Sequence, residues 1–232
     1  MGLYGLVGAG RSELAKAIIG ASAVTGGEVL VEGKKATIWS ALEALRKFRI
    51  GYVSEDRKNE GLILSHSIAK NIAITVWHTI AGRLGLISGA AEKAAVRPYA
   101  DKLEVKATSL DQTIANLSGG NQQKVSVAKW LTANTRILII DEPTVGVDVR
   151  TKGYLHQLVW NLADTDVSVL LISSELSEMT QLADRIYIMN DYRIIAELTN
   201  TRDYDTMSAS IMHAIQKDND RQSAPEPLAT VA

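Results

Sequence analysis

The apolar residues of this chain follow two spacings, one typical of buried strands and one typical of helices. Strand-length runs occur at 2–6, 29–31, 50–53, 137–140, 167–172, 185–189 and 193–198. Apolar residues three or four apart, as on one face of a helix, occur within 11–19, 40–48, 150–164 and 175–183. Because continuous apolar strands are buried on both faces, this alternation predicts an α/β fold with a mostly parallel sheet and helices on either side.

The middle of the chain lacks strand signals and is helical in pattern. Four apolar residues lie four apart after Ser67, which can cap their helix: Ile68, Ile72, Val76 and Ile80. A second helix is expected at 90–103. The sequence therefore predicts a helical subdomain inserted into the α/β core. Near the C-terminus, Asp191 and Tyr192 separate the last two strand signals and predict a hairpin turn.

Composition narrows the class of protein. The chain has 232 residues, 46% of them hydrophobic and 22% charged, which excludes a disordered or fibrous protein. A formal net charge of −1 provides no general attraction to nucleic acid, so an anion needs a local site. The absence of cysteine excludes disulfides and thiolate metal sites and makes the cytosolic side the expected location. The apolar runs are far shorter than the ~20 residues that span a bilayer, and no signal peptide is recognised.

A glycine-rich segment between the first strand and the first helix carries the first candidate chemistry. Gly5, Gly8 and Gly10 precede Arg11 and Ser12 in the spacing of a phosphate loop. Glycines allow successive N–H groups to surround phosphate oxygens, the following helix adds the positive end of its dipole, and a serine hydroxyl can reach Mg²⁺. The alternative is that the segment is only a tight strand-to-helix connection.

Two further segments carry polar groups where they suit phosphate chemistry. A serine and two glycines at 118–120 open a helix and expose N–H donors toward an anion, although an ordinary serine cap is the alternative. Asp141 and Glu142 follow the buried strand 137–140. Asp141 is suited to hold Mg²⁺ through water, and Glu142 to accept a proton from an attacking water. A tight polar turn follows at 146–148.

These motifs occur together in one family. The phosphate loop is followed by LSGGNQQK at 117–124, IIDEPT at 139–144 and GVD at 146–148. In them the chain resembles the nucleotide-binding domain of an ABC transporter over roughly residues 1–200. The resemblance implies a P-loop NTPase (RecA-like) core with an inserted α-helical subdomain. The N-terminal β-subdomain that carries the family's adenine-stacking aromatic is largely missing, so the chain is expected to be a piece of a longer protein.

Four stretches carry a finer resemblance: GLVGAGRSEL at 5–14, YVSEDRKNEGL at 52–62, the LSGGNQQK segment and ISSELSE at 172–178. They are similar to the second nucleotide-binding half of the fused ATPase subunits of bacterial monosaccharide importers of the ribose, xylose or galactose type. In that group two halves pair head to tail. Each ATP is then clamped between the phosphate loop of one half and the signature of the other, which is the LSGGNQQK segment in this chain.

The resemblance implies a set of site residues. The nucleotide-binding positions are Gly5, Gly8, Gly10, Arg11, Ser12, Ser118, Gly119, Gly120 and Gln122; the Mg²⁺ positions are Ser12 and Asp141; the catalytic base is Glu142; the switch and coupling positions are Glu55, Asp148 and Ser174. Three of these depart from the family. Its phosphate-loop lysine is matched by Arg11, its glutamine by Glu55 and its switch histidine by Ser174.

The three departures predict that the two ATP sites of the paired halves differ in turnover. Arginine is a planar fork rather than a compact ammonium, and serine cannot donate as an imidazole does, so each change removes a transition-state interaction worth ~2 to 4 kcal/mol. We therefore expect residues 5–12 to bind nucleotide but turn it over poorly, while residues 117–123 complete a partner's site. The alternative is that the loop tolerates arginine and hydrolyses ATP normally.

The expected organisation follows the motifs. Residues 1–65 form the first part of the ATPase core, 66–135 the helical subdomain that ends in the signature, 136–200 the second part of the core, 201–216 a C-terminal helix and 217–232 a disordered tail.

The resemblance implies a peripheral protein at the cytoplasmic face of the inner membrane that uses ATP and Mg²⁺ to drive monosaccharide uptake. Its implied partners are a first nucleotide-binding half, membrane permease subunits and, indirectly, a periplasmic sugar-binding protein, but no nucleic acid. One alternative is a non-hydrolysing regulatory nucleotide-binding module. A non-transport ABC ATPase fits less well, because the interval between Ser12 and Ser118 is too short for a long coiled-coil insertion.

Overall fold

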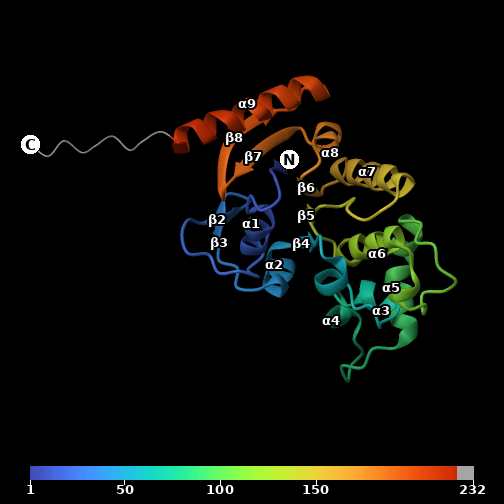
Figure 1. The fold of residues 1–232 in the computed structure, drawn as a ribbon. Coiled ribbons are helices and arrows are strands. Elements are labelled where there is room, and N and C mark those ends of the chain that lie inside the picture. The colour runs from blue at the N-terminus through green and yellow to red at the C-terminus, as the bar shows by residue number, and fades with distance from the viewer. Residues whose placement is uncertain (224–232) are drawn as a thin grey trace, which may run out of the picture. The chain divides into compact units, whose positions relative to one another are not determined.

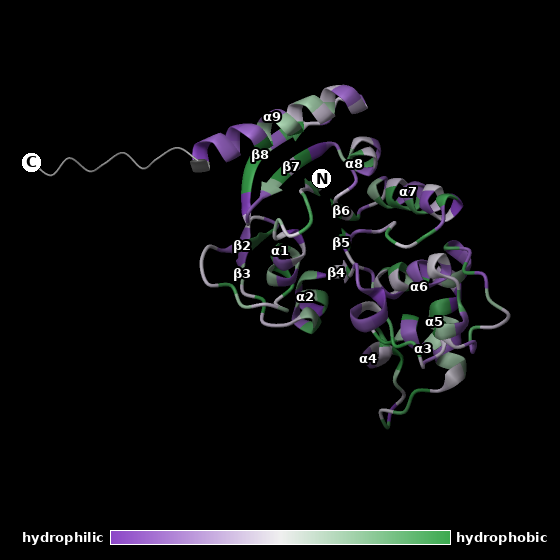
Figure 2. Ribbon diagram, in the orientation of Figure 1, coloured by the Kyte–Doolittle hydropathy of each residue, from purple (hydrophilic) through white to green (hydrophobic). Residues whose placement is uncertain are grey.

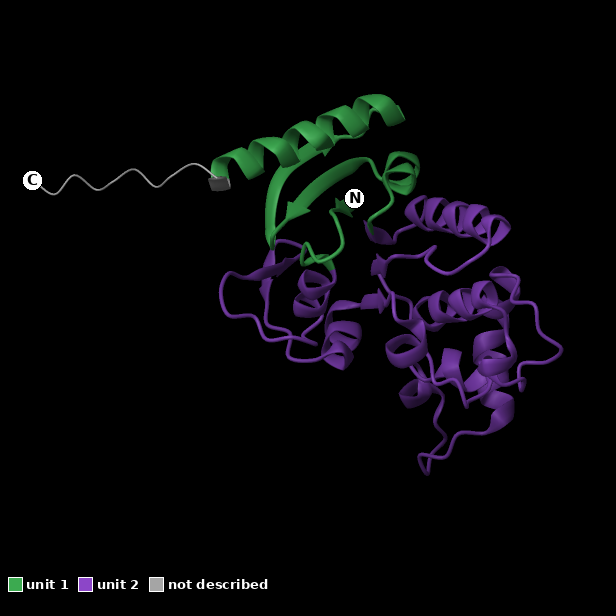
Figure 3. Ribbon diagram, in the orientation of Figure 1, with its two compact units in different colours: residues 1–11, 173–232 green, residues 12–172 purple. Residues whose placement is uncertain are grey.

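The computed structural model describes residues 1–223 and contains two compact units (Figures 1 and 3). One unit consists of residues 1–11 and 173 onward, and the other of residues 12–172. Each contains parallel strands accompanied by helices. The predicted α/β class with mostly parallel pairing is therefore confirmed. The predicted domain boundaries are not tested by this division and stay predictions.

The larger unit is organised around three parallel strands. β4 (Ile50–Val53) pairs with β5 (Ile137–Asp141), which pairs with β6 (Ser168–Ser173). Their apolar residues that are at most 2% exposed are Ile50, Val53, Leu138, Ile139, Ile140, Leu171 and Ile172. Burial on both faces explains why these strands are continuously apolar. β5 ends in Asp141, so the strand delivers that carboxylate to the carboxyl edge of the sheet.

Three further helices and a hairpin belong mainly to this unit. They are α1 (Arg11–Ile18), the antiparallel pair β2 (Val29–Val31) and β3 (Lys34–Ala36), α2 (Ala41–Phe48) and α7 (Val149–Ala163). Ser40 caps α2 by accepting a hydrogen bond from the Glu43 N–H, and Asp148 caps α7 through Thr151. These caps fix where the two helices begin.

The helical insert contains α3 (Ile68–Ala73), α4 (Trp77–Ile80), α5 (Gly89–Lys102) and α6 (Gly119–Thr132), with short turns at η1 (Arg57–Gly61) and η2 (Ile114–Asn116). α3, α5 and α6 pack on one another around fully buried side chains, among them Ile68, Ile72, Val96, Leu103 and Val125. The four helices lie within the predicted range 66–135. A single helix over 67–80 is wrong, because the chain breaks between α3 and α4.

The smaller unit combines both ends of the described chain. β1 (Gly2–Tyr4) pairs in parallel with β7 (Arg185–Asn190), and β8 (Arg193–Thr199) returns antiparallel to β7. The predicted hairpin turn at Asp191 and Tyr192 is confirmed. Figure 2 shows the strongly hydrophobic colouring of β7, whose Ile186 and Ile188 are fully buried.

Two helices pack on these three strands. α8 (Leu176–Leu182) packs on β1, and α9 (Tyr204–Ser223) packs on β7, β8 and α8. α9 runs past the helix end predicted at 216, so the predicted start of the tail at 217 is too early; the rest of that tail lies outside the described residues. None of the helices within residues 1–223 is both long and apolar enough to cross a bilayer.

Candidate nucleotide-binding site

The phosphate loop connects β1 to α1, and its glycines are required by the backbone. Gly8 and Gly10 have φ values of 86° and 94°, in the left-handed region that side chains disfavour. At Gly5 a Cβ would lie 2.5 Å from the Met189 carbonyl oxygen. The Ala9 N–H donates to the Leu6 carbonyl at 3.1 Å and closes the loop. The sequence thus folds here into the tight strand-to-helix turn that a phosphate cradle needs.

The residue that replaces the family's lysine is folded back against this loop. The Arg11 side chain is only 8% exposed, and its Cδ lies 3.4 Å from the Cβ position of Gly5. The aliphatic part of Arg11 thus lies against the loop, and its charge is on a planar guanidinium rather than on a compact ammonium. Ser12, the predicted Mg²⁺ residue, is the second residue of α1 and is half-buried.

Asp141, predicted to bind metal, is fully buried at the end of β5. The Tyr52 hydroxyl donates to its Oδ2 at 2.8 Å. Burial, together with the Asp141 charge, raises the pKa of Tyr52 well above its ordinary value. Tyr52 therefore stays protonated and holds Oδ2 of Asp141 with its hydroxyl. Sequence reasoning missed Tyr52; its position in β4, the strand beside β5, is the signal that marks it.

The predicted catalytic base adopts an unusual backbone conformation. Glu142 has φ 46° and is 6% exposed. Its N–H donates to the Ile172 carbonyl at 2.9 Å, which holds the residue against β6. A non-glycine residue in the left-handed region costs about 1 to 2 kcal/mol, and such strain persists only where surrounding contacts enforce it. The strain is located at the residue to which the proton-accepting role was assigned.

The segment 54–61, which contains Glu55, is held by ionic and polar contacts. Glu55 itself is exposed. Glu60 accepts from the Ser54 hydroxyl at 2.7 Å and from the Lys16 ammonium at 2.7 Å. The Lys16 hydrogen bond lowers the pKa of Glu60, and the same bond raises the pKa of Lys16. The contact ties this segment to α1, the helix that follows the phosphate loop.

Arg57 connects this segment to the GVD turn. Its guanidinium donates to the Val145 carbonyl at 2.9 Å and to the Gly146 carbonyl at 3.2 Å. A Cβ at Gly119 would lie 3.1 Å from both Arg57 Nη2 and the Gly146 carbonyl oxygen. Arg57 therefore lies between the turn and the first residue of the signature helix. Sequence reasoning missed its role, because only the folded chain brings these residues together.

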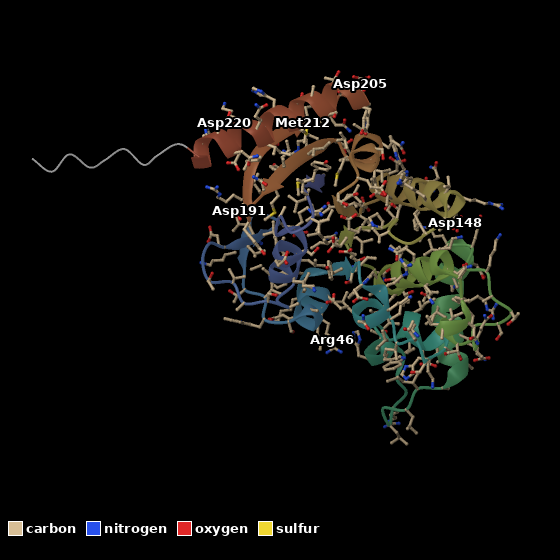
Figure 4. The ribbon with its side chains drawn as sticks, in the orientation of Figure 1. Arg46, Asp148, Asp191, Asp205, Met212 and Asp220 are labelled. Atoms are coloured by element: carbon tan, nitrogen blue, oxygen red, sulfur yellow. The ribbon has the colours of Figure 1, made fainter. Side chains whose placement is uncertain are left out.

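The signature segment and the GVD turn, predicted separately, lie in contact. Ser118 caps α6: its Oγ accepts from the Asn121 N–H and, at 3.0 Å, from the Asn121 side chain. A Cβ at Gly120 would lie 2.6 Å from the Thr151 side chain. Thr151 donates to Asp148 from its N–H at 3.0 Å and its hydroxyl at 2.8 Å, which lowers the pKa of Asp148. Figure 4 labels Asp148 at the start of α7.

Two further predicted site residues are Gln122 and Ser174. Gln122 is 6% exposed, and its amide donates to the carbonyls of Ile114 and Leu117, both at 3.3 Å. It is thus directed into the protein and supports the segment before the signature. Ser174 lies between β6 and α8, in the smaller unit, where the Ser173 hydroxyl accepts from the Glu175 N–H. Their nucleotide-binding and switch roles stay predictions.

Comparison with known proteins adds independent information. The family model described as ABC transporter matches residues 1–145, and one described as P-loop domain matches 88–225. A ribose import ATP-binding protein of Streptomyces avermitilis is 44% identical over 198 residues, covering 85% of this chain and 39% of the relative. That of Jannaschia sp. is 42% identical over 199 residues, covering 85% of this chain and 38% of the relative. This chain thus spans well under half the length of either.

Solved structures share the fold. A dimeric ATP-binding cassette in a post-hydrolysis state, bound to ADP and Pi, has a TM-score of 0.72 at 23% identity, over 85% of this chain and 84% of that chain. A nucleotide-free cassette from an ABC transporter has a TM-score of 0.76 at 19% identity, over 92% and 86%. The predicted P-loop NTPase fold is confirmed. Its motifs, its fold and the family match show that this chain belongs to the ABC transporter family.

Proposed function

We propose that this chain is a nucleotide-binding half of the ATP-binding subunit of a bacterial sugar importer, and that its signature completes an ATP site whose phosphate loop lies on a partner half. It couples ATP binding and hydrolysis to monosaccharide uptake by permease subunits, at the cytoplasmic face of the inner membrane, with a periplasmic sugar-binding protein acting indirectly. The relatives named for ribose import support the substrate class.

The observation that carries this proposal is that the signature begins exposed and its two glycines are closely packed. Ser118 is exposed at the start of α6, while a Cβ would fit tightly at Gly119, against Arg57 and Gly146, and would collide with Thr151 at Gly120. The signature helix therefore begins at an exposed serine above a firmly packed base. An exposed anion-binding helix start suits a nucleotide that another half supplies.

Residues of this chain supply the groups for phosphoryl transfer. Asp141 and Ser12 offer the carboxylate and hydroxyl oxygens that Mg²⁺ prefers, so the donor set fits that ion. Held by Asp141 and Ser12, Mg²⁺ would supply positive charge that offsets the charge of the phosphates. The Tyr52 hydroxyl orients Asp141 by donating to its Oδ2. Glu142 takes the proton of the attacking water.

The phosphate loop and the switch residues carry the three departures that are expected to slow ATP hydrolysis. Arg11 is buried with its Cδ against Gly5, and a planar guanidinium differs in geometry from the lysine ammonium that contacts the terminal phosphate in the family. Glu55 and Ser174 stand where the family has a glutamine and a histidine. We infer that this loop binds ATP and Mg²⁺ but hydrolyses ATP slowly.

The test compares two substitutions in the complex assembled from both halves and the permease. Ser118→Arg places a bulky cation on the exposed signature and is expected to reduce ATP turnover at least tenfold. Arg11→Ala alters a site that already turns over slowly and is expected to change turnover less than twofold. Steady-state ATPase rates measure both. Equal reductions by the two substitutions contradict the asymmetry.

Ser88→Arg is the matched control for Ser118→Arg. Ser88 caps α5 and accepts from the Ala91 N–H at 3.1 Å, as Ser118 caps α6. The control therefore removes an equivalent serine cap in the same helical region without touching the signature. Turnover is expected to stay within twofold of the wild type. A loss as large as that of Ser118→Arg shows that capping alone accounts for the effect.

A non-hydrolysing regulatory module is the second candidate, and the buried Arg11 favours it. It predicts nucleotide binding without turnover even when the partner half is present. A non-transport ABC ATPase predicts salt-sensitive binding to RNA or DNA, whereas an importer subunit co-purifies with membrane permease subunits. Affinity purification at two salt concentrations separates these outcomes.

A further inference from the structure

The hairpin turn between β7 and β8 is strained. Asp191 and Tyr192 have φ values of 44° and 60°, so two consecutive side chains occupy the left-handed region. Such turns favour asparagine and glycine, and a tyrosine there costs folding free energy. Figure 4 labels Asp191 in this turn. Because such strain persists only where surrounding contacts enforce it, the contacts of Tyr192 are informative.

Tyr192 lies on the phosphate loop, and both segments belong to the smaller unit. Its N–H donates to the Ala9 carbonyl at 3.0 Å. Its ring covers Gly10: a Cβ on that glycine would lie 2.9 Å from Tyr192 Cε1 and 3.0 Å from Cγ. The turn therefore contacts the peptide between Ala9 and Gly10 with both a hydrogen bond and an aromatic ring.

These contacts determine which way one N–H of the loop points. In a trans peptide the carbonyl and the N–H of the next residue point in opposite directions. No cis peptide bond is present in the described chain. With the Ala9 carbonyl held toward Tyr192, the Gly10 N–H points away from the turn. Glycine at φ 94° rotates easily, so without the ring only the backbone hydrogen bond from residue 192 opposes a flip of this peptide.

We propose that Tyr192 is a positioning residue of the phosphate loop, which locks the Ala9–Gly10 peptide so that the Gly10 N–H is available to a bound phosphate. The inference rests on the proposed nucleotide binding by residues 5–12. Tyr192 is 63% exposed, so its packing contributes less to folding than that of a buried tyrosine. Loop orientation then accounts for a strained tyrosine at a position where glycine would be more stable.

The decisive substitution is Tyr192→Gly, which keeps the N–H, removes the ring and relieves the left-handed strain. The melting temperature is expected to stay constant or rise, while the Kd for Mg²⁺-ADP, measured by calorimetry on the 232-residue chain, rises about tenfold. Tyr192→Phe retains the ring and is expected to bind as the wild type does. Glu104→Gly is the matched control, since Glu104 is exposed, has φ 49° and lies outside the motifs. It relieves equivalent strain without changing the Kd.

Each outcome has a separate meaning. A Tyr192→Gly Kd within twofold of the wild type overturns the positioning role. If the wild type binds no Mg²⁺-ADP, the proposed nucleotide binding fails. Hydrogen exchange of the amides at 8–12 then tests separately whether Tyr192 positions the loop. Faster exchange confined to those amides in Tyr192→Gly supports it, and unchanged exchange overturns it. A lower melting temperature with faster exchange throughout the unit assigns the ring to general stability and also overturns it.

Discussion

At the scale of single residues, Arg57 is the side chain that contacts both the signature and the GVD turn. A lysine at this position keeps the charge but offers a compact ammonium that reaches one carbonyl, not two. We expect Arg57→Lys to lower the free energy of unfolding by about 1 kcal/mol, the usual worth of one hydrogen bond. Because Gly119 loses its neighbour, turnover of the assembled complex is expected to fall several-fold.

Urea unfolding and ATPase assays measure the two effects. Arg46→Lys is the control, since Arg46 is exposed on α2 (Figure 4) and is expected to change neither. Unfolding and turnover that both match the wild type in Arg57→Lys contradict the bridging role. Arg57 was not predictable from sequence: its charge is visible, but its partners are 88 and 89 residues away. Ser118 and Asp141 were predictable because their chemistry lies within short local motifs.

At the scale of elements, the signature helix carries a buried cation. Lys129 of α6 is 9% exposed and donates to the Gly61 carbonyl at 2.6 Å, which fastens α6 to the end of segment 54–61. Burial lowers the pKa of Lys129 to about 8, against 10.5 for the free side chain. Between these values the unfolded chain binds the proton and the folded chain does not. The contribution to stability therefore rises with pH across that window, by roughly 3 kcal/mol at most.

Lys129→Met is expected to remove this pH dependence while keeping a side chain of similar length. Urea unfolding at several pH values between 8 and 10.5 measures it for both proteins, and their difference isolates Lys129 from other alkaline titrations. The wild type should gain stability relative to Lys129→Met as pH rises. A constant difference across the window contradicts a buried, proton-releasing lysine.

The break between α3 and α4 shows what periodicity omits. Residues 68–80 keep a helical spacing throughout, so the sequence predicts one helix. The structure interrupts it at Ile74, Thr75 and Val76, a run of branched side chains that stiffen and disfavour helix. The Thr75 hydroxyl donates to the Lys129 carbonyl at 2.8 Å, and Val76 has φ −118°. A contact with another helix thus decides a local boundary that the apolar spacing leaves continuous.

At the scale of the whole molecule, the sequence predicted the strands but not their grouping. β1 pairs with β7, whose residues lie more than 180 positions later. Pairing over that distance depends on tertiary packing and leaves no local signal. The division at residues 11 and 172 therefore emerges only from the fold.

This division predicts that the two units unfold at different urea concentrations. Trp39, Trp77, Trp130 and Trp160 all lie in residues 12–172, so tryptophan fluorescence reports the larger unit alone, whereas far-UV circular dichroism reports both. A smaller unit buries a smaller fraction of its surface and is less stable. We expect the dichroism transition in urea to begin at a lower concentration than the fluorescence transition. Tyr204→Trp in α9 places a probe in the smaller unit and should add an early fluorescence component. Because both probes follow one event in a two-state protein, superimposable curves for all probes would show a single cooperative unit.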